Sequence, residues 1–110
     1  MSNKNNKDDP GKIITGGFSG IGIDSKASID AFNFLKEELL KKQPGIILLQ
    51  ILKAEEQVVA GSNIGLICQY KKPKDKQVSI LYAKIYVDLQ DKYELDQLEF
   101  DPGKFPEELR

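Results

Sequence analysis

The sequence predicts an α+β fold in which one long helix packs on a curved antiparallel β-sheet of four to five strands. Two observations favour this class. Only residues 24–42 carry a convincing helical repeat of apolar side chains, whereas from residue 46 onward the chain is rich in residues that favour strands, divided by short polar turns. Because these strand-like runs follow one another without an intervening helix, antiparallel pairing is expected, with the helix covering one face of the sheet.

The composition limits the function. The chain of 110 residues has room for one domain of ordinary size, and its 16 basic and 17 acidic residues nearly cancel. This balance argues against nucleic acid or a membrane as the main partner. The chain has no histidine and only one cysteine, which removes the usual catalytic triads and zinc ligand sets. We therefore expect neither an enzyme nor a protein that requires a metal or another cofactor.

The ends of the chain differ from its middle. Residues 1–15 are polar and then include glycine, which predicts a flexible N-terminal arm, and residues 102–110 form a short charged tail. Residues 16–101 are expected to form the folded domain. The first ten residues lack the apolar block of a secretory signal, so we expect a cytoplasmic protein, or a secreted one if a signal was omitted from the chain as given.

The helix has clear boundaries in the sequence. Asp24 and Ser25 offer an N-terminal cap, and the run Gln43, Pro44 and Gly45 ends the helix. The apolar repeat predicts a buried stripe on one face of this helix, which consists of Ala31, Phe32, Leu35 and Leu39.

The strands follow in order. Residues 46–59 form a strand long enough to need a curve or a bulge, and residues 62–71 return from it. Two further strands are expected at residues 77–89 and 93–100. Cys68 lies within an apolar run of the second strand, so we expect it to be a buried core residue rather than a reactive thiol.

The bend between the first two of these strands is unusual. Gln57, Val58, Val59, Ala60 and Gly61 place two valines where a hairpin normally has polar residues and glycine. Exposed apolar side chains at such a tip more often mark a contact surface than an error. Taken alone, the run is also compatible with an ordinary strand end followed by a turn.

Residues 49–61 closely resemble the signature strand of the cystatins and its Gln-x-Val-x-Gly loop. Three other segments match that family in order and spacing: Gly16 with Gly17 resembles its N-terminal glycine pair, residues 31–34 resemble its helix, and residues 84–86 resemble the strand before its second loop. The resemblance implies a cystatin-like fold. It also implies a reversible, tight-binding competitive inhibitor of papain-like cysteine proteases of the cathepsin type, closest to the stefin branch because the chain offers no disulfide and no signal peptide.

The resemblance further implies which residues would touch the protease. Gly16 would be a hinge from which the arm lies along the substrate cleft, and two hairpin loops would enter the cleft beside it. The residues that this places at the interface are Ile14, Thr15, Gly16 and Gly17 of the arm, Gln57, Val58, Val59, Ala60 and Gly61 of the first loop, and Leu89 and Gln90 of the second.

The second loop departs from the pattern of the secreted cystatins, which carry Pro-Trp at this place. The chain has Leu89 and Gln90 there and contains no tryptophan. An alternative function therefore stays open, that of a non-inhibitory cystatin-fold interaction or scaffold protein. We expect a monomer, and a domain-swapped dimer that opens the valine bend is the other possibility.

Overall fold

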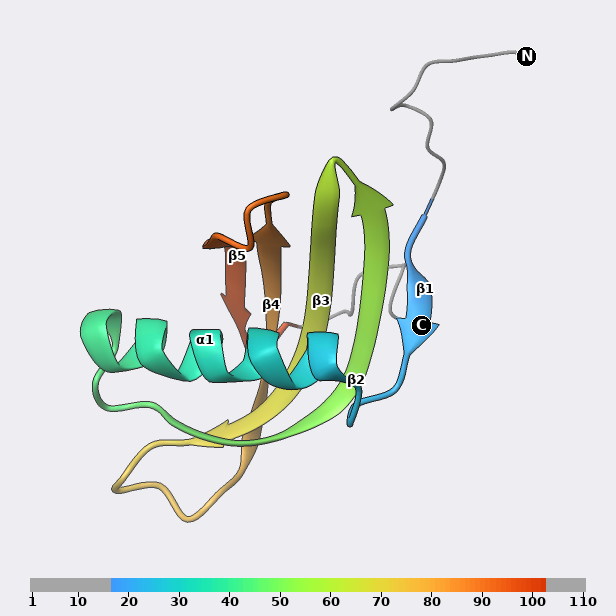
Figure 1. The fold of residues 1–110 in the computed structure, drawn as a ribbon. Coiled ribbons are helices and arrows are strands. Elements are labelled where there is room, and N and C mark those ends of the chain that lie inside the picture. Colours follow the sequence, from blue (N-terminus) through green and yellow to red (C-terminus); the bar gives the residue numbers. More distant parts are fainter. Residues whose placement is uncertain (1–16, 103–110) are drawn as a thin grey trace, which may run out of the picture.

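The computed structural model describes residues 17–102, so the whole predicted arm (residues 1–15), Gly16 and the last eight residues of the tail lie outside it. Its elements follow in the order β1 (Ser19–Ile21), α1 (Lys26–Lys42), β2 (Ile47–Val59), β3 (Gly61–Lys71), β4 (Ser79–Val87) and β5 (Tyr93–Phe100). The five strands form one antiparallel sheet in sequence order, and α1 lies across one face of it (Figure 1). The predicted α+β class is confirmed.

The strand β1 corrects the expected element order, because we placed every strand after the helix. Ser19 pairs with Glu56 and Ile21 with Ala54, so this short strand forms one edge of the sheet beside β2. Its three residues, Ser, Gly and Ile, have no alternating pattern that would have predicted a strand. The unpaired backbone of the long strand β2 provides partners for it, so tertiary context overrides the weak local preference.

The helix begins as the sequence predicts. Ser25 is its N-cap, and the Ser25 hydroxyl accepts a hydrogen bond from the Ser28 amide at 3.2 Å. Ser28 is fully buried, and its own hydroxyl donates to the carbonyl of Gly22 at 2.7 Å. This second bond joins the first turn of α1 to the loop after β1 and satisfies a polar group that would be costly to bury alone.

The buried stripe of α1 differs from the prediction at one position. Ala31, Leu35 and Leu39 are buried as expected, whereas Phe32 is only half-buried at the edge of the core. The Lys36 ammonium lies 5.7 Å from the centre of the Phe32 ring. Phe32 therefore covers the margin of the helix–sheet interface, where a cation can reach its exposed side.

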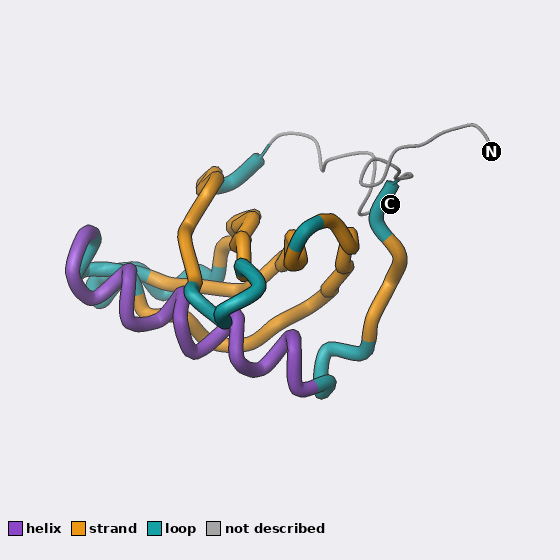
Figure 2. Tube along the Cα trace, turned by 45° about the horizontal axis from the view of Figure 1, so that its top comes forward, coloured by secondary structure: helices purple, strands orange, loops and turns teal. Residues whose placement is uncertain are grey.

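The strand β2 has the irregularities that its length predicts. Its pairing with β3 shifts register between Leu48 and Gln50 and again between Ile51 and Lys53. Such bulges bend a strand and increase its twist, and Figure 2 shows the sheet curving around the helix. Within residues 17–102, no helix is long and apolar enough to cross a membrane.

The core lies between α1 and the middle of the sheet. The fully buried side chains from the strands include Leu66 and Cys68 of β3 and Leu81 and Ile85 of β4. The prediction that Cys68 is a core residue is confirmed. Because burial disfavours the charged thiolate, the pKa of the Cys68 thiol is raised from 9.0 to about 12.

This pKa shift predicts how stability depends on pH. The contribution of the protonated Cys68 thiol to the free energy of unfolding is complete below about pH 9. It is lost as the pH rises toward 12, because the thiol ionises in the unfolded chain while it stays protonated in the folded one. Between pH 9 and pH 10 the free energy of unfolding should fall by about 1 kcal/mol from this group. Urea unfolding of the native chain and of Cys68→Ala measures it, and the variant should lack this part of the slope.

Candidate functional site

Three segments meet at one end of the sheet. The first loop (residues 57–61) comprises the end of β2, Ala60 and the first residue of β3, and the second loop (residues 88–92) joins β4 to β5. The strand register brings the loops to the same end, because Ser62 pairs with Val87 and Val87 pairs with Tyr93. The start of β1 lies there too, since Ser19 pairs with Glu56 next to the first loop. We call this region the loop end; it is uppermost in Figure 1.

The first loop is a very tight connection. Val59 pairs directly with Gly61, so only Ala60 lies between the two strands. Gly61 has a φ of 99°, in the region that favours glycine, and a Cβ at this position would overlap the carbonyl oxygen of Val87 on β4. Glycine is therefore required for two reasons. Its positive φ would strain any other residue, and the neighbouring hairpin leaves no room for a side chain.

Polar side chains hold the first loop in place. The Tyr86 hydroxyl on β4 donates to the carbonyl of Ala60 at 2.5 Å. The Asn63 side-chain amide donates to the Gln57 side-chain oxygen at 2.9 Å across the base of the hairpin. Asn63 and Tyr86 had no predicted role at the site. The only feature of the sequence that could have indicated them is their position, because each lies two residues from a loop, in strands that pair with each other.

The second loop is organised by one aspartate. The Asp88 carboxylate accepts hydrogen bonds from the backbone amides of Gln90 at 2.8 Å and Lys92 at 2.9 Å. Asp91 adopts a φ of 62°, which this short polar residue tolerates better than most. Asp88 was not among the predicted site residues, although its side chain fixes the backbone of the second loop.

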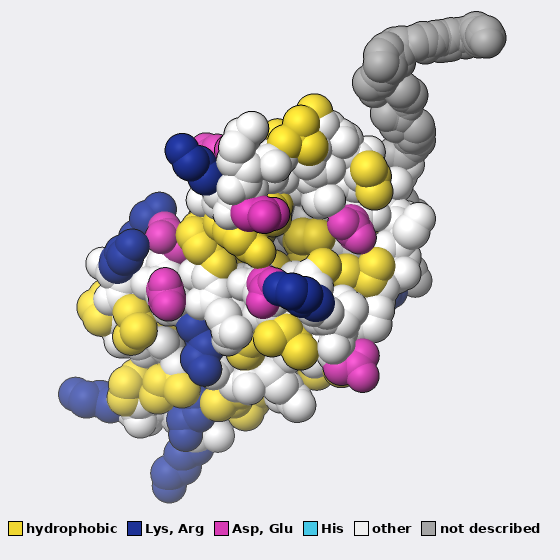
Figure 3. Space-filling model, in the orientation of Figure 1, with side chains coloured by type: hydrophobic (Ala, Val, Ile, Leu, Met, Phe, Trp, Pro, Cys, Tyr) yellow, Lys and Arg dark blue, Asp and Glu magenta, His cyan; other side chains and the backbone are white. Residues whose placement is uncertain are grey.

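Both loops present apolar side chains to solvent at their tips. Val58 is 71% exposed and Leu89 is 74% exposed, although both belong to residue types that normally avoid water. Hydrophobic side chains gather over the tip of the β2–β3 hairpin in Figure 3. Hydrogen bonds at Ala60 and Asp88 fix the backbone of the two loops, so these side chains are held in exposed positions. Val59, which we also expected to be exposed at this tip, is instead half-buried.

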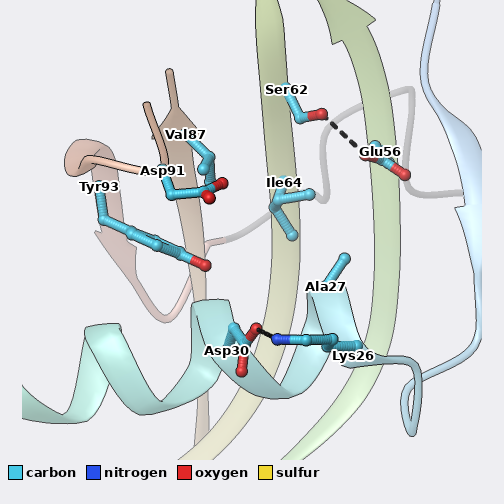
Figure 4. A pocket seen from close by; sticks show the side chains of 9 residues that line it. All are labelled: Lys26, Ala27, Asp30, Glu56, Ser62, Ile64, Val87, Asp91 and Tyr93. Atoms are coloured by element: carbon cyan, nitrogen blue, oxygen red, sulfur yellow. Dashed lines mark hydrogen bonds and ion pairs between the residues drawn. The ribbon is translucent and has the colours of Figure 1, made fainter. Parts of the chain in front are cut away.

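A hollow of about 470 Å³ lies below the two loops, on the helix side of the sheet (Figure 4). Lys26 and Asp30 of α1 form an ion pair of 2.6 Å at its lower edge. Burial raises the pKa of the Tyr93 hydroxyl on the opposite wall, and the nearby carboxylates Asp30 and Asp91 raise it further. Among residues 17–102 no group of three or more potential metal ligands comes together. The hollow is lined by Lys26, Ala27, Asp30, Glu56, Ser62, Ile64, Val87, Asp91 and Tyr93.

The structure brings most of the predicted site residues together. The first loop, with Gln57, Val58, Val59, Ala60 and Gly61, lies beside the second, with Leu89 and Gln90, and Gly17 lies just before β1. Leu89 and Gln90 are both in the turn rather than at a strand end, because β4 ends at Val87. The remaining predicted residues, Ile14, Thr15 and Gly16, lie outside the described part of the chain.

One helix on a five-stranded antiparallel sheet, with two hairpin loops and the start of β1 at one end, is the cystatin fold. The chain is similar in structure to a salivary cystatin from the soft tick Ornithodoros moubata, with a TM-score of 0.65 and 21% sequence identity. The match covers 79% of this chain and 98% of the tick protein. No family model and no curated protein sequence matches the chain. The similarity establishes the fold.

Proposed function

We propose that this protein is a reversible, competitive inhibitor of papain-like cysteine proteases and that the loop end is the wedge that enters their active-site cleft. The observation that carries the proposal is the pair of exposed apolar tips, Val58 and Leu89, which lie at the same end of the sheet. The cystatin fold and the resemblance of residues 49–61 to the signature strand and loop of that family support it.

The proposed mechanism is occupation of the cleft without cleavage. Val58 and Leu89 would leave water and fill apolar surface in the cleft, so shape and desolvation supply most of the affinity. The Ala60 carbonyl already accepts a hydrogen bond from Tyr86, and the flanking residues Val59 and Gly61 are paired. A protease would have to break this pairing before it could align a loop peptide bond with its catalytic cysteine. The loop therefore binds as a rigid, poor substrate.

The arm completes the proposed wedge. Gly17 lies two residues before β1, whose first residue, Ser19, pairs with Glu56 next to the first loop, so in the proposed complex the arm would extend from the loop end. Ile14 and Thr15 would then lie along the non-primed part of the cleft, with Gly16 as the hinge. We propose that the protein is a stefin-like inhibitor and that it acts in the cytoplasm.

A titration of papain tests this function. Residual activity on a fluorogenic peptide would be measured at increasing concentrations of the full chain and at several substrate concentrations. We expect competitive inhibition that reverses on dilution, with an inhibition constant that is independent of the preincubation time once equilibrium is reached. Full papain activity at a micromolar excess of the protein would rule the proposal out and leave a non-inhibitory interaction protein.

The role of Tyr86 gives a sharper prediction. Tyr86→Phe removes only the hydroxyl that holds the Ala60 carbonyl, so the first loop should become more mobile while the core stays intact. Loss of one such hydrogen bond costs about 1 kcal/mol, which corresponds to about fivefold weaker inhibition. Tyr82→Phe, a change on the same strand but farther from the first loop, is the control, and equal losses of inhibition in both variants would contradict a specific role for Tyr86.

A further inference from the structure

Lysines are concentrated in two segments of the chain. Residues 36–42 and 71–76 together contain seven lysines and only three carboxylates, although the whole chain has a net charge of −1. In contrast, residues 88–99 contain five carboxylates and one lysine. The near-zero net charge of the whole chain argued against a membrane partner. The lysines and the carboxylates are, however, concentrated in different segments of the chain.

The second lysine-rich segment lies beside the α1–β2 loop, which directly follows the first. The first is the C-terminal half of α1, and the second is the turn between β3 and β4, at the end of the sheet opposite the loop end. A hollow of about 390 Å³ lies between the α1–β2 loop and this turn, and Ile46, Lys72 and Lys74 contribute to its wall. We call this region the basic end. Its lysines are Lys36, Lys41, Lys42, Lys71, Lys72, Lys74 and Lys76.

Most of this positive charge is not neutralised within the described chain. Lys41 and Lys42 share one carboxylate, that of Glu38, at 3.6 and 3.4 Å. Among residues 17–102, no ion pair involves Lys72 or Lys74. Asp101 lies beside Lys72 at the rim of another hollow, but its carboxylate accepts a hydrogen bond from Tyr70. The basic end therefore retains a strong positive field.

Exposed apolar side chains lie among these lysines. Leu40 on the last turn of α1 is 68% exposed, and Ile47 at the start of β2 is also exposed. Both line a hollow of about 220 Å³ that includes Lys36 and Pro44. Figure 3 shows this arrangement at the lower left, where lysine and hydrophobic side chains alternate over the helix end and the β3–β4 turn.

We propose that the basic end binds the surface of an anionic lipid bilayer. Lysines near such a surface are attracted by the acidic headgroups, and apolar side chains beside them can enter the headgroup region, which a soluble polyanion does not offer. The exposed Leu40 and Ile47 among the lysines favour the bilayer over a polyanion. The loop end lies at the other end of the sheet, so a membrane-bound molecule would keep its two loops directed away from the lipid.

Cosedimentation with vesicles tests the proposal. At low salt the full chain should bind vesicles of phosphatidylcholine with about one-third phosphatidylserine and should not bind pure phosphatidylcholine. Reversing two charges in Lys72→Glu/Lys74→Glu should weaken binding by on the order of thirtyfold or more. Leu40→Gln keeps all charges and should weaken it several-fold, because Leu40 is the most exposed apolar side chain of the basic end.

The matched control is Lys26→Glu/Lys53→Glu, which changes the net charge by the same amount outside the basic end. It should retain nearly all vesicle binding. Equal losses in the two double variants, or no binding of the native chain to acidic vesicles, would overturn the proposal. Binding to heparin together with no effect of Leu40→Gln on vesicle binding would also overturn it, in favour of a polyanion. Vesicle binding is measured without any protease, so failure of the bilayer proposal and failure of the inhibitor proposal can be told apart.

Discussion

Replacing Gly61 with alanine is expected to lower the free energy of unfolding by about 3 kcal/mol and to weaken protease inhibition by more than about a hundredfold. The backbone φ of 99° strains any residue with a Cβ, and that Cβ would also overlap the Val87 carbonyl oxygen. Either the first loop or the neighbouring end of β4 must move. Chemical unfolding and papain inhibition measure the two effects.

The control for this prediction is Gly45→Ala. Gly45 lies in the α1–β2 loop, where an added Cβ meets nothing within 4 Å and the φ is not in the glycine region. The Gly45 variant should keep both stability and inhibition close to the native values. If Gly61→Ala behaved like Gly45→Ala, the first loop would be more adaptable than its geometry indicates.

Val58→Asp should abolish inhibition almost completely while leaving the fold unchanged. Val58 is 71% exposed, so the free protein loses little packing, but in the proposed complex the new carboxylate would be desolvated without a partner. We expect at least about a hundredfold increase in the inhibition constant, or about 3 kcal/mol. The effect should be large because the chain has no tryptophan in its second loop to share the contact.

Val78→Asp is the matched control. Val78 is also exposed, at 46%, but it precedes β4 at the other end of the sheet. The substitution is chemically identical and adds the same charge, so it should leave inhibition of papain unchanged. Similar losses in both variants would mean that added negative charge, rather than the loop end, decides binding.

The sequence predicted the elements whose signals are local. The α1 cap at Ser25, its end near Gln43 and the curvature of β2 each follow from a few neighbouring residues. The strand β1 could not be predicted, because Ser19, Gly20 and Ile21 have weak strand preference and depend on pairing with β2. The half-buried position of Phe32 likewise depends on how far the sheet extends below the helix.

The sequence predicted the apolar residues at the tip of the first loop but not the residues whose hydrogen bonds hold the two loops in place. The valines of the first loop are unusual at a bend, so Val58 and Val59 could be recognised from the chain alone. Tyr86 could not, because its hydrogen bond to Ala60 depends on the register of β3 and β4. Asp88 differs, because its bonds to Gln90 and Lys92 are local, and an aspartate at the start of a turn was a signal that the sequence offered. Gly61 was predicted as a residue of the first loop, but its close contact with Val87 belongs to the tertiary structure.

Binding to papain with an open or a blocked cleft tests the central claim most directly. Calorimetry would compare papain whose catalytic cysteine carries only a small alkyl group with papain whose cleft is filled by a covalent peptidyl inhibitor. The wedge that we propose forms no bond to the enzyme, so the native chain should bind the first form and fail to bind the second. No binding to either form, or equal binding to both, would contradict the account.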